Sequence, residues 1–357
     1  MPKGNTQKPI ALILAGFDKP DRKTMIKRKK QLIEAYDGDV IYIGKNKFLQ
    51  TLAGKPVIQY VLDAIYHAKK HGKPLYEKIY VYNDVQNFTD AIDTKKYKNL
   101  TVLQMKQSVG GHLKDFYFNY IDYGQRLDIF FGDTPRITTK DVEWINREYD
   151  SILGKAKDYR GAIVHLIYSI VEYPDVAKDT WLPHRMKAIK RGEYKGKHKY
   201  FVGFDTFEAR IGNSAAIIKH HSIDPIVEYQ IIDFFYGLRK ALSPNIFSKI
   251  LYHLWKTKNF DVIRQVKQRC LEEEKFYRAV IDVIERVYKL DLSNFGGYIY
   301  HIRNNAAHWE NDIDSPKDLK AFRAHMEKWC FFTIDNTCFA RYISIIKHIH
   351  NNVLVGE

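Results

Sequence analysis

The stretch Ile10-Ala11-Leu12-Ile13-Leu14-Ala15-Gly16 decides the fold class, because it is a short apolar run that stops at a glycine. A continuous apolar run of this length is typical of a strand buried on both faces, as in a parallel sheet. The glycine predicts a tight turn in which backbone N–H groups approach a phosphate. Many strand–glycine pairs are only tight turns, so the rest of the chain has to support this interpretation.

Strand-like and helix-like segments alternate over the first two-thirds of the chain. Further strands are predicted over residues 78–82, 100–104, 127–131 and 161–169, and helices over 55–70, 88–92, 113–123 and 139–149. This rhythm predicts an α/β fold with a Rossmann-like, mostly parallel sheet and helices on both faces. Ligands of such sheets bind beyond the carboxyl ends of the strands, where the strand order reverses.

The pattern changes after about residue 224, where apolar residues recur at helical spacing. We therefore divide the chain into an α/β core, a helical insertion and a last part, over residues 1–223, 224–297 and 298–357. The last part holds a return strand over 298–302, an Asp-x-Asp motif and C-terminal helices. We expect the insertion either to line a substrate pocket or to form a homodimer.

The composition describes a globular chain with a strong basic excess. Hydrophobic residues make up 45% of the 357 residues, charged residues make up 28%, and the formal net charge is +15. Such an excess suits polyanions, which are nucleic acid, an anionic membrane surface or phosphate-rich substrates. The basic residues are spread along the chain without a zinc-finger, RNP or KH pattern, so we do not expect nucleic acid as the partner.

The chain offers no signal for a membrane or an oxidising compartment. No apolar run approaches the ~18 residues that a membrane-spanning helix needs. The three cysteines show no metal-ligand spacing, and an odd count without CxxC indicates a reducing environment. We therefore expect a cytoplasmic protein.

The segment Phe131-Gly132-Asp133-Thr134-Pro135 closes a predicted strand with a carboxylate. A carboxylate at the carboxyl end of a strand, in a loop stiffened by proline, is well placed to hold Mg²⁺. The alternative is a carboxylate that only favours a helix N-terminus through the helix dipole.

A second acidic segment, Asp312-Ile313-Asp314-Ser315-Pro316-Lys317-Asp318, lies far along the chain. Asp312 and Asp314 are candidates for further metal carboxylates. The same residues also form a good helix start, with Ser315 as N-cap, Pro316 at the first helical position and Asp318 at the third. Both interpretations can hold together.

With these segments in this order, the sequence resembles the nucleotidyltransferase superfamily with a GT-A-like fold, which includes sugar-phosphate and molybdenum-cofactor nucleotidyltransferases. Matching segments are Leu12–Gly16, Asn46–Leu49, Gly54-Lys55-Pro56, Leu103–His112 and the two acidic segments above. The resemblance covers about residues 9–220 and 298–320. The Leu103–His112 run is similar to the base-reading loop of UDP-N-acetylglucosamine pyrophosphorylases.

The resemblance implies Mg²⁺-dependent transfer of a nucleotidyl group from an NTP to a small phosphorylated acceptor, with release of pyrophosphate. Asp133, Asp312 and Asp314 would bind Mg²⁺, Lys47 would stabilise the α-phosphate, and Arg22 and Lys23 would neutralise the pyrophosphate. The nucleotide would contact Leu14, Ala15, Gly16, Gln104, Gln107, Gly110 and Gly111. The anionic acceptor would contact Arg185, Lys187, Lys190 and Asn213.

Two alternatives stay open at this stage. Phe17–Arg22 replaces the family's Gly-x-Gly-x-Arg, about twenty extra residues follow, and Val109 stands where the base loop usually has glycine. These departures would also suit a non-catalytic nucleotide-binding protein. A GT-A glycosyltransferase that uses a nucleotide sugar is the other enzyme class, although Gly-Lys-Pro favours the pyrophosphorylases.

Overall fold

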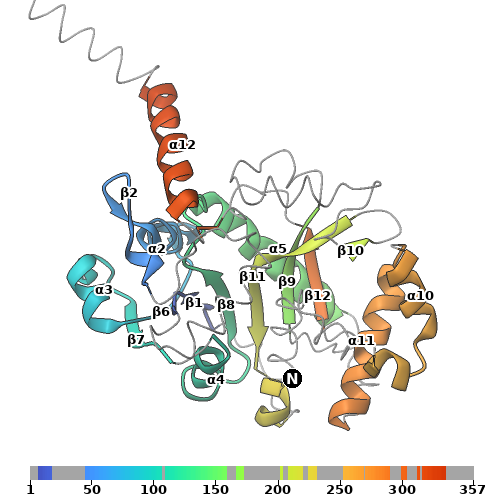
Figure 1. Ribbon diagram of the computed structural model, residues 1–357. Helices are drawn as coiled ribbons and strands as arrows, with labels where there is room; N and C mark the ends of the chain where they lie inside the picture. Colours follow the sequence, from blue (N-terminus) through green and yellow to red (C-terminus); the bar gives the residue numbers. More distant parts are fainter. Residues whose placement is uncertain are drawn as a thin grey trace, which may run out of the picture.

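The computed structural model describes residues 7–17, 45–106, 109–158, 166–172, 202–203, 208–219, 224–230, 252–268, 270–289, 299–303, 312–313 and 316–334. Figure 1 shows a central sheet with helices packed around it. The sheet consists of β1 (Ile10–Leu14), β6 (Ile79–Asn83), β7 (Leu100–Gln104), β8 (Arg126–Phe131), β9 (Leu166–Glu172), β10 (Val202–Gly203), β11 (Glu208–Ile218) and β12 (Ile299–Arg303).

The strand order is β12-β9-β11-β8-β1-β6-β7, with β10 paired to β11. Strands β8, β1, β6 and β7 are parallel to one another, and β12 is parallel to β9. Among the described strands of this sheet, β11 is the one that runs in the opposite direction, between β8 and β9. The prediction of a Rossmann-like, mostly parallel α/β sheet is therefore confirmed.

The strand order reverses beside β1. From β1 the chain continues to β6 and β7 on one side, and it then returns to β8 on the other side. The turns after β1 and β8 therefore leave the same edge of the sheet at the point where ligands of open α/β sheets bind.

The helices are α2 (Val57–His67), α3 (Val85–Ala91), α4 (Val109–Asn119), α5 (Thr139–Asp158), α10 (Phe260–Gln268), α11 (Glu273–Tyr288) and α12 (Pro316–Ile334). Residues 225–230 and 252–256 are also helical. Short elements are the 3-10 turns η1 (Lys47–Leu49) and η2 (Thr94–Lys96) and the hairpins β2–β3 (Thr51–Leu52, Lys55–Pro56) and β4–β5 (Lys69–Lys70, Lys73–Pro74). In the described part of the chain, no helix is long and apolar enough to cross a bilayer.

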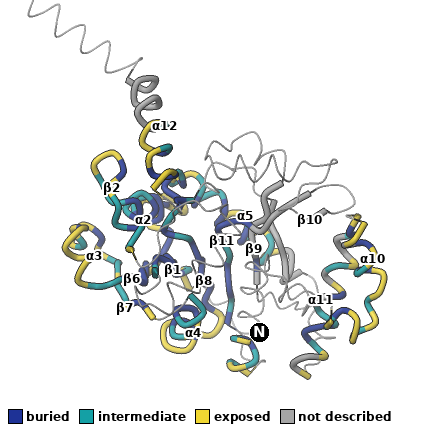
Figure 2. Tube along the Cα trace, viewed as in Figure 1, coloured by how far each residue is buried: buried dark blue, intermediate teal, exposed yellow. Residues whose placement is uncertain are grey.

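Alternate residues of β1 serve two cores, as the side-chain period of a strand requires. Ala11 and Ile13 belong to the core that α2, α3 and α5 cover, whereas Leu12 and Leu14 belong to the core under α4. All five residues of β1 are buried, and Figure 2 shows β1, β6 and β8 as the dark centre of the molecule. The apolar run Ile10–Leu14 is thus a strand that is covered on both faces.

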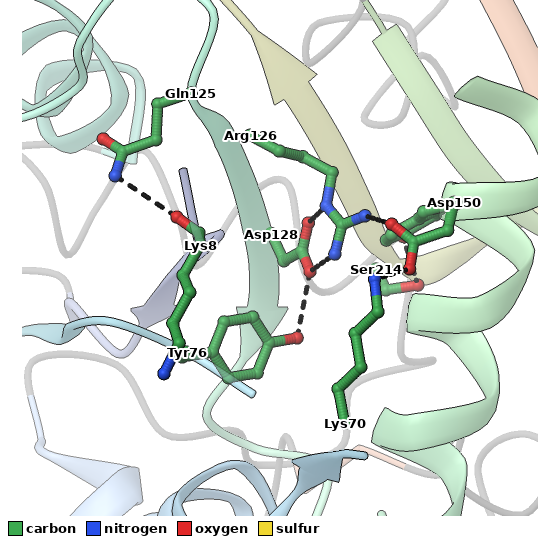
Figure 3. A network of polar contacts seen from close by, with 9 residues as sticks. Lys8, Lys70, Tyr76, Gln125, Arg126, Asp128, Asp150 and Ser214 are labelled. Carbon is green, nitrogen blue, oxygen red and sulfur yellow. Dashed lines mark hydrogen bonds and ion pairs between the residues drawn. The ribbon is translucent and has the colours of Figure 1, made fainter. Parts of the chain in front are cut away.

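A network of charges ties β8 to α5, and its members Arg126 and Asp128 are buried (Figure 3). Arg126 donates from Nε and Nη2 to the two oxygens of Asp128 at 2.8 and 3.0 Å, and from Nη1 to Asp150 Oδ1 at 2.7 Å. The Tyr76 hydroxyl donates to Asp128 Oδ2 at 3.0 Å. Burial raises the pKa of the Asp128 carboxyl, and the Arg126 guanidinium opposes that shift. The network lies at the amino end of β8, at the opposite sheet edge from Asp133.

The C-terminal part returns to the Lys47–Val57 region. Ile313, Leu319 and Phe322 share a small core with Leu52 and Val57. Arg323 Nη2 of α12 donates to the Thr51 carbonyl at 2.7 Å, although the two residues are 272 positions apart. The predicted return strand is present as β12. The division of the chain into three parts stays a prediction.

Candidate active site

The turn after β8 lies directly against the turn after β1. The Gly132 N–H donates to the Leu14 carbonyl at 3.1 Å, and Thr134 Oγ1 closes the turn by donating to the Phe131 carbonyl at 2.8 Å. A Cβ added to Gly132 would meet Ala15 Cβ at 3.0 Å and Phe48 Cδ1 at 3.1 Å. A larger residue at this position would therefore require Ala15 and Phe48 to shift by a few tenths of an ångström.

Asp133 forms an ion pair with Lys47, which lies 86 residues earlier in the chain. The Lys47 Nζ donates to Asp133 Oδ2 at 2.6 Å. Both side chains are only slightly exposed, at 15% and 14%, so the charges interact with little screening by solvent. The structure thus joins the predicted phosphate-binding lysine to the predicted metal ligand.

The second acidic segment lies next to the Asp133 loop. The Ile313 N–H donates to the Asp133 carbonyl at 3.0 Å, and Ile313 itself is fully buried. Asp312 is half-buried and directly precedes this contact. We expected the two loops to share one edge of the sheet, and their backbones do meet there. Metal binding by Asp312 stays a prediction, and Asp314 lies outside the described residues.

The chemistry of these groups suits Mg²⁺. The described residues contain no cluster of three or more His, Cys, Asp or Glu. Mg²⁺ nevertheless needs only one or two carboxylates when substrate phosphates and waters complete its coordination. Asp133 with Asp312 in the neighbouring loop would satisfy that requirement, while Lys47 balances the charge of Asp133.

The predicted base-reading segment differs in shape from our expectation. Helix α4 begins at Val109, so Gly110 and Gly111 lie in its first turn and not in a loop. The Tyr229 hydroxyl donates to the Gly110 carbonyl at 3.2 Å. Gln104 ends β7 and accepts from the Val85 N–H at 3.2 Å, which places its side chain at the start of α3. Roles of these residues toward a nucleotide stay predictions.

His112 connects α4 to the β1 turn. Its ring stacks on Tyr82 with centroids 4.6 Å apart, and a Cβ on Gly16 would lie 2.0 Å from His112 Cε1. His112 is 1% exposed, so its ring is almost completely removed from water. Gly16 is thus required by the close approach of this ring, which sequence analysis did not anticipate.

Burial lowers the pKa of His112 from 6.5 to about 4. Between these pH values the unfolded chain binds the proton and the folded chain does not, so stability rises with pH across this window. We expect a contribution of about 3 kcal/mol between pH 4 and 6.5. Urea unfolding at a series of pH values would show it as a steeper pH dependence in the wild type than in His112→Phe. Parallel curves for the two proteins would contradict a neutral, buried imidazole.

Asn213 lies in β11 at the same edge as the site. Ser214 pairs with Phe130 of β8, so the preceding Asn213 lies beside the end of β8 near Phe131. It is buried at 4% exposure, next to the irregularity in pairing between β11 and β9. The remaining predicted site residues fall outside the described residues: Arg22, Lys23, Gln107, Arg185, Lys187 and Lys190.

Two functional candidates that sequence analysis missed are Asn46 and Asn83. Asn46 Nδ2 donates to Asn83 Oδ1 at 2.7 Å, and Asn83 Nδ2 donates to the Ala15 carbonyl at 2.8 Å. The available signal was the place of Asn83 at the end of an apolar strand, the same position that drew attention to Asp133 and Gln104.

Comparisons with known proteins find similarity at the level of solved structures. No protein-family model and no curated protein matches the chain. A structure named as a hypothetical transferase from Thermus thermophilus has 16% identity and a TM-score of 0.49, and the match covers 88% of this chain and 100% of that one.

Two further structures are similar over most of this chain. The 4-diphosphocytidyl-2C-methyl-D-erythritol synthase from Anaerococcus prevotii has 10% identity and a TM-score of 0.43, covering 90% of this chain and 96% of that one. A CMP:2-keto-3-deoxy-manno-octonic acid synthetase complexed with CTP has 14% identity and a TM-score of 0.40, covering 90% and 99%. Because all three TM-scores are below 0.5, the function of this chain has to be inferred from its own site.

Proposed function

We propose that the chain is a nucleotidyltransferase that moves an NMP group from an NTP to a small phosphorylated acceptor. The observation that carries the proposal is the Lys47–Asp133 ion pair at the carboxyl edge of the sheet, where the strand order reverses. The adjoining Asp312 loop, bonded to the Asp133 carbonyl through Ile313, supports it. Fold alone would not distinguish this function from others, so the site residues decide.

In the proposed reaction a phosphate oxygen of the acceptor attacks the α-phosphorus of the NTP. A new P–O bond forms as the bond from the α-phosphorus to the bridging oxygen breaks, and pyrophosphate leaves with those electrons. The protein needs no covalent nucleophile, because positioning and charge neutralisation carry the reaction. Asp133 and Asp312 would hold Mg²⁺, which supplies charge neutralisation at the phosphates when bound.

We propose that the Lys47 ammonium group changes its partner during this reaction. In the described structure its ammonium group lies on Asp133. When a metal neutralises Asp133, we propose that Lys47 turns its charge to the α-phosphate, where negative charge develops in the transition state. Arg22 and Lys23 are proposed to neutralise the leaving pyrophosphate. Arg185, Lys187, Lys190 and Asn213 are proposed to contact the acceptor.

A pyrophosphate-release assay tests this function. The purified chain is incubated with Mg²⁺ and each of ATP, CTP, GTP and UTP against a panel of sugar phosphates and other small phosphorylated acceptors. We expect acceptor-dependent pyrophosphate release with at least one pair. In a parallel reaction with nucleotide sugars in place of the NTP, release of a nucleotide without pyrophosphate would favour a glycosyltransferase. Nucleotide binding without either reaction would favour a non-catalytic binding protein.

Lys47→Ala is expected to lower kcat by about 10²-fold with a smaller rise in KM, because the charge acts mainly on the transition state. Steady-state kinetics with the best NTP and acceptor would measure both constants. Lys70→Ala is the matched control, since Lys70 Nζ also pairs with an aspartate, Asp150, at 2.7 Å, but at the opposite sheet edge. An unchanged kcat in Lys47→Ala would remove this lysine from the mechanism.

A further inference from the structure

Asn83 contacts two segments at the proposed phosphate site, the turn after β1 and the segment that holds Asn46 and Lys47. It is the last residue of β6, next to β1 in the sheet, and it is fully buried. A buried amide without hydrogen-bond partners would lower the stability of the fold by about 1–3 kcal/mol. The partners of the Asn83 amide therefore indicate its role.

The Asn83 amide uses both of its ends. Its Nδ2 donates to the Ala15 carbonyl at 2.8 Å, in the turn after β1. Its Oδ1 accepts from Asn46 Nδ2 at 2.7 Å and from the Asp84 N–H at 2.9 Å. One side chain therefore holds the β1 turn, the start of α3 and the residue that precedes Lys47.

Together with backbone connections and the Lys47–Asp133 ion pair, these hydrogen bonds form a closed ring of contacts around the site. Asn46 leads to Lys47, and Lys47 pairs with Asp133. The Gly132 N–H beside Asp133 donates to the Leu14 carbonyl, and Leu14 leads to Ala15 and back to Asn83. The turn that carries Lys47 is itself short, with the Gln50 N–H donating to the Lys47 carbonyl at 3.3 Å. Asn83 is thus connected to Lys47 through the side chain of the preceding residue, Asn46.

We infer that Asn83 is a positioning residue for nucleotidyl transfer, which sets the place of Lys47 relative to the β1 turn. This inference rests on the proposed function. A side-chain amide carries its donor and its acceptor on separate atoms, so Asn83 can donate to the Ala15 carbonyl and accept from Asn46 and Asp84 at once. An aspartate would face the Ala15 carbonyl with an acceptor, and an alanine would leave both neighbouring segments without their bonds.

The test compares Asn83→Ala, Asn83→Asp and Asn46→Ala with Asn99→Ala as the matched control. Asn99 also makes side-chain bonds to backbone, with Nδ2 donating to the Tyr76 carbonyl at 3.2 Å and to the Glu77 carbonyl at 3.4 Å. Those bonds lie at the amino end of β6, away from the site. Asn83→Ala is expected to lower kcat by about 10–10²-fold with little change in KM, since a small misplacement of a catalytic group costs rate. Asn99→Ala should keep the wild-type kcat.

A double-mutant cycle separates positioning from general stability. If Asn83 acts through Lys47, Asn83→Ala should add less than about twofold to the kcat loss in the Lys47→Ala background. A full, additive loss in that background would overturn the inference. Equal losses of kcat in Asn83→Ala and in Asn99→Ala would overturn it as well.

Hydrogen exchange gives a readout that does not depend on activity. Asn83→Ala should speed exchange of the Leu49 and Gln50 amides relative to the wild type, whereas Asn99→Ala should not. If the wild type releases no pyrophosphate, the proposed function is wrong. The hydrogen-exchange measurement would still show whether Asn83 orders the turn that carries Lys47. Unchanged exchange at Leu49 and Gln50 would show that Asn83 does not order the Lys47 turn.

Discussion

Asp133→Asn is expected to lower kcat by at least about 10³-fold while the fold stays intact, because a metal carboxylate supplies several kcal/mol of transition-state stabilisation. The asparagine keeps an oxygen that can accept from Lys47, so little stability should be lost. The Asp133 backbone, which binds Ile313 through its carbonyl, is unchanged by the substitution. Pyrophosphate release with saturating NTP and acceptor measures the loss, and circular dichroism checks the fold.

Asp63→Asn is the control for this variant. Asp63 also pairs with a lysine, since Lys55 Nζ lies 3.0 Å from Asp63 Oδ2, but its side chain belongs to α2. The control should keep the wild-type rate within about twofold, because a partly exposed ion pair contributes little. If Asp133→Asn turned over at the wild-type rate, Asp133 would be only a partner for Lys47 and no metal ligand.

Arg126→Met is expected to lower the free energy of unfolding by about 3–5 kcal/mol, because it leaves Asp128 buried without its cation. Asp128 is fully buried and would keep the Tyr76 hydroxyl as a hydrogen-bond donor. Urea unfolding at pH 7 measures the change. Lys70→Ala breaks only the exposed contact to Asp150 in the same network, and it should cost at most about 1 kcal/mol.

Removing the whole polar group should undo much of that loss. In the triple variant Arg126→Met, Asp128→Leu and Tyr76→Phe, no buried charge or hydroxyl is left without its partner. Replacing a complete buried ion pair with apolar side chains is often neutral for stability. If Arg126→Met alone were as stable as the wild type, Asp128 would not depend on Arg126 for its charge.

The strands of the sheet were the most predictable part of the fold. Ile10–Leu14 and Leu100–Gln104 have the predicted bounds, and β6, β8 and β12 differ from prediction by a residue at one or both ends. A strand buried on both faces, such as β1, is a continuous apolar run, so its ends are visible where the run stops. Polar residues just after such runs then indicated the edge of the sheet at which Asp133 lies.

The start of α4 was less predictable. The resemblance of Leu103–His112 to a base-reading loop placed Gly110 and Gly111 in a loop, and the helix was predicted to begin at residue 113. In the structure they occupy the first helical turn, where His112 packs on Gly16 and Tyr82. The first turn of α4 thus packs on a turn that is distant in the sequence, and such a contact leaves no periodic signal in the sequence.

The contacts between site residues could not be predicted from the sequence, because they also join residues that are far apart in the chain. Lys47 and Asp133 are 86 positions apart, and Asn83 and Ala15 are 68 positions apart. Ala15, Lys47 and Asp133 were candidates from their own segments, but the bonds between site residues depend on the strand order. Without that order, Asn83 was only the residue after a predicted strand.

A crystal structure with Mn²⁺ and a non-hydrolysable analogue of the tightest-binding NTP tests the proposed site most directly. We expect an anomalous Mn²⁺ peak within about 2.5 Å of an Asp133 carboxylate oxygen, with an Asp312 oxygen or a bridging water beside it. The α-phosphate should lie within hydrogen-bond reach of Lys47 Nζ, between the turns after β1 and β8. A nucleotide bound elsewhere, or bound at this edge with no metal near Asp133, would contradict the proposed mechanism.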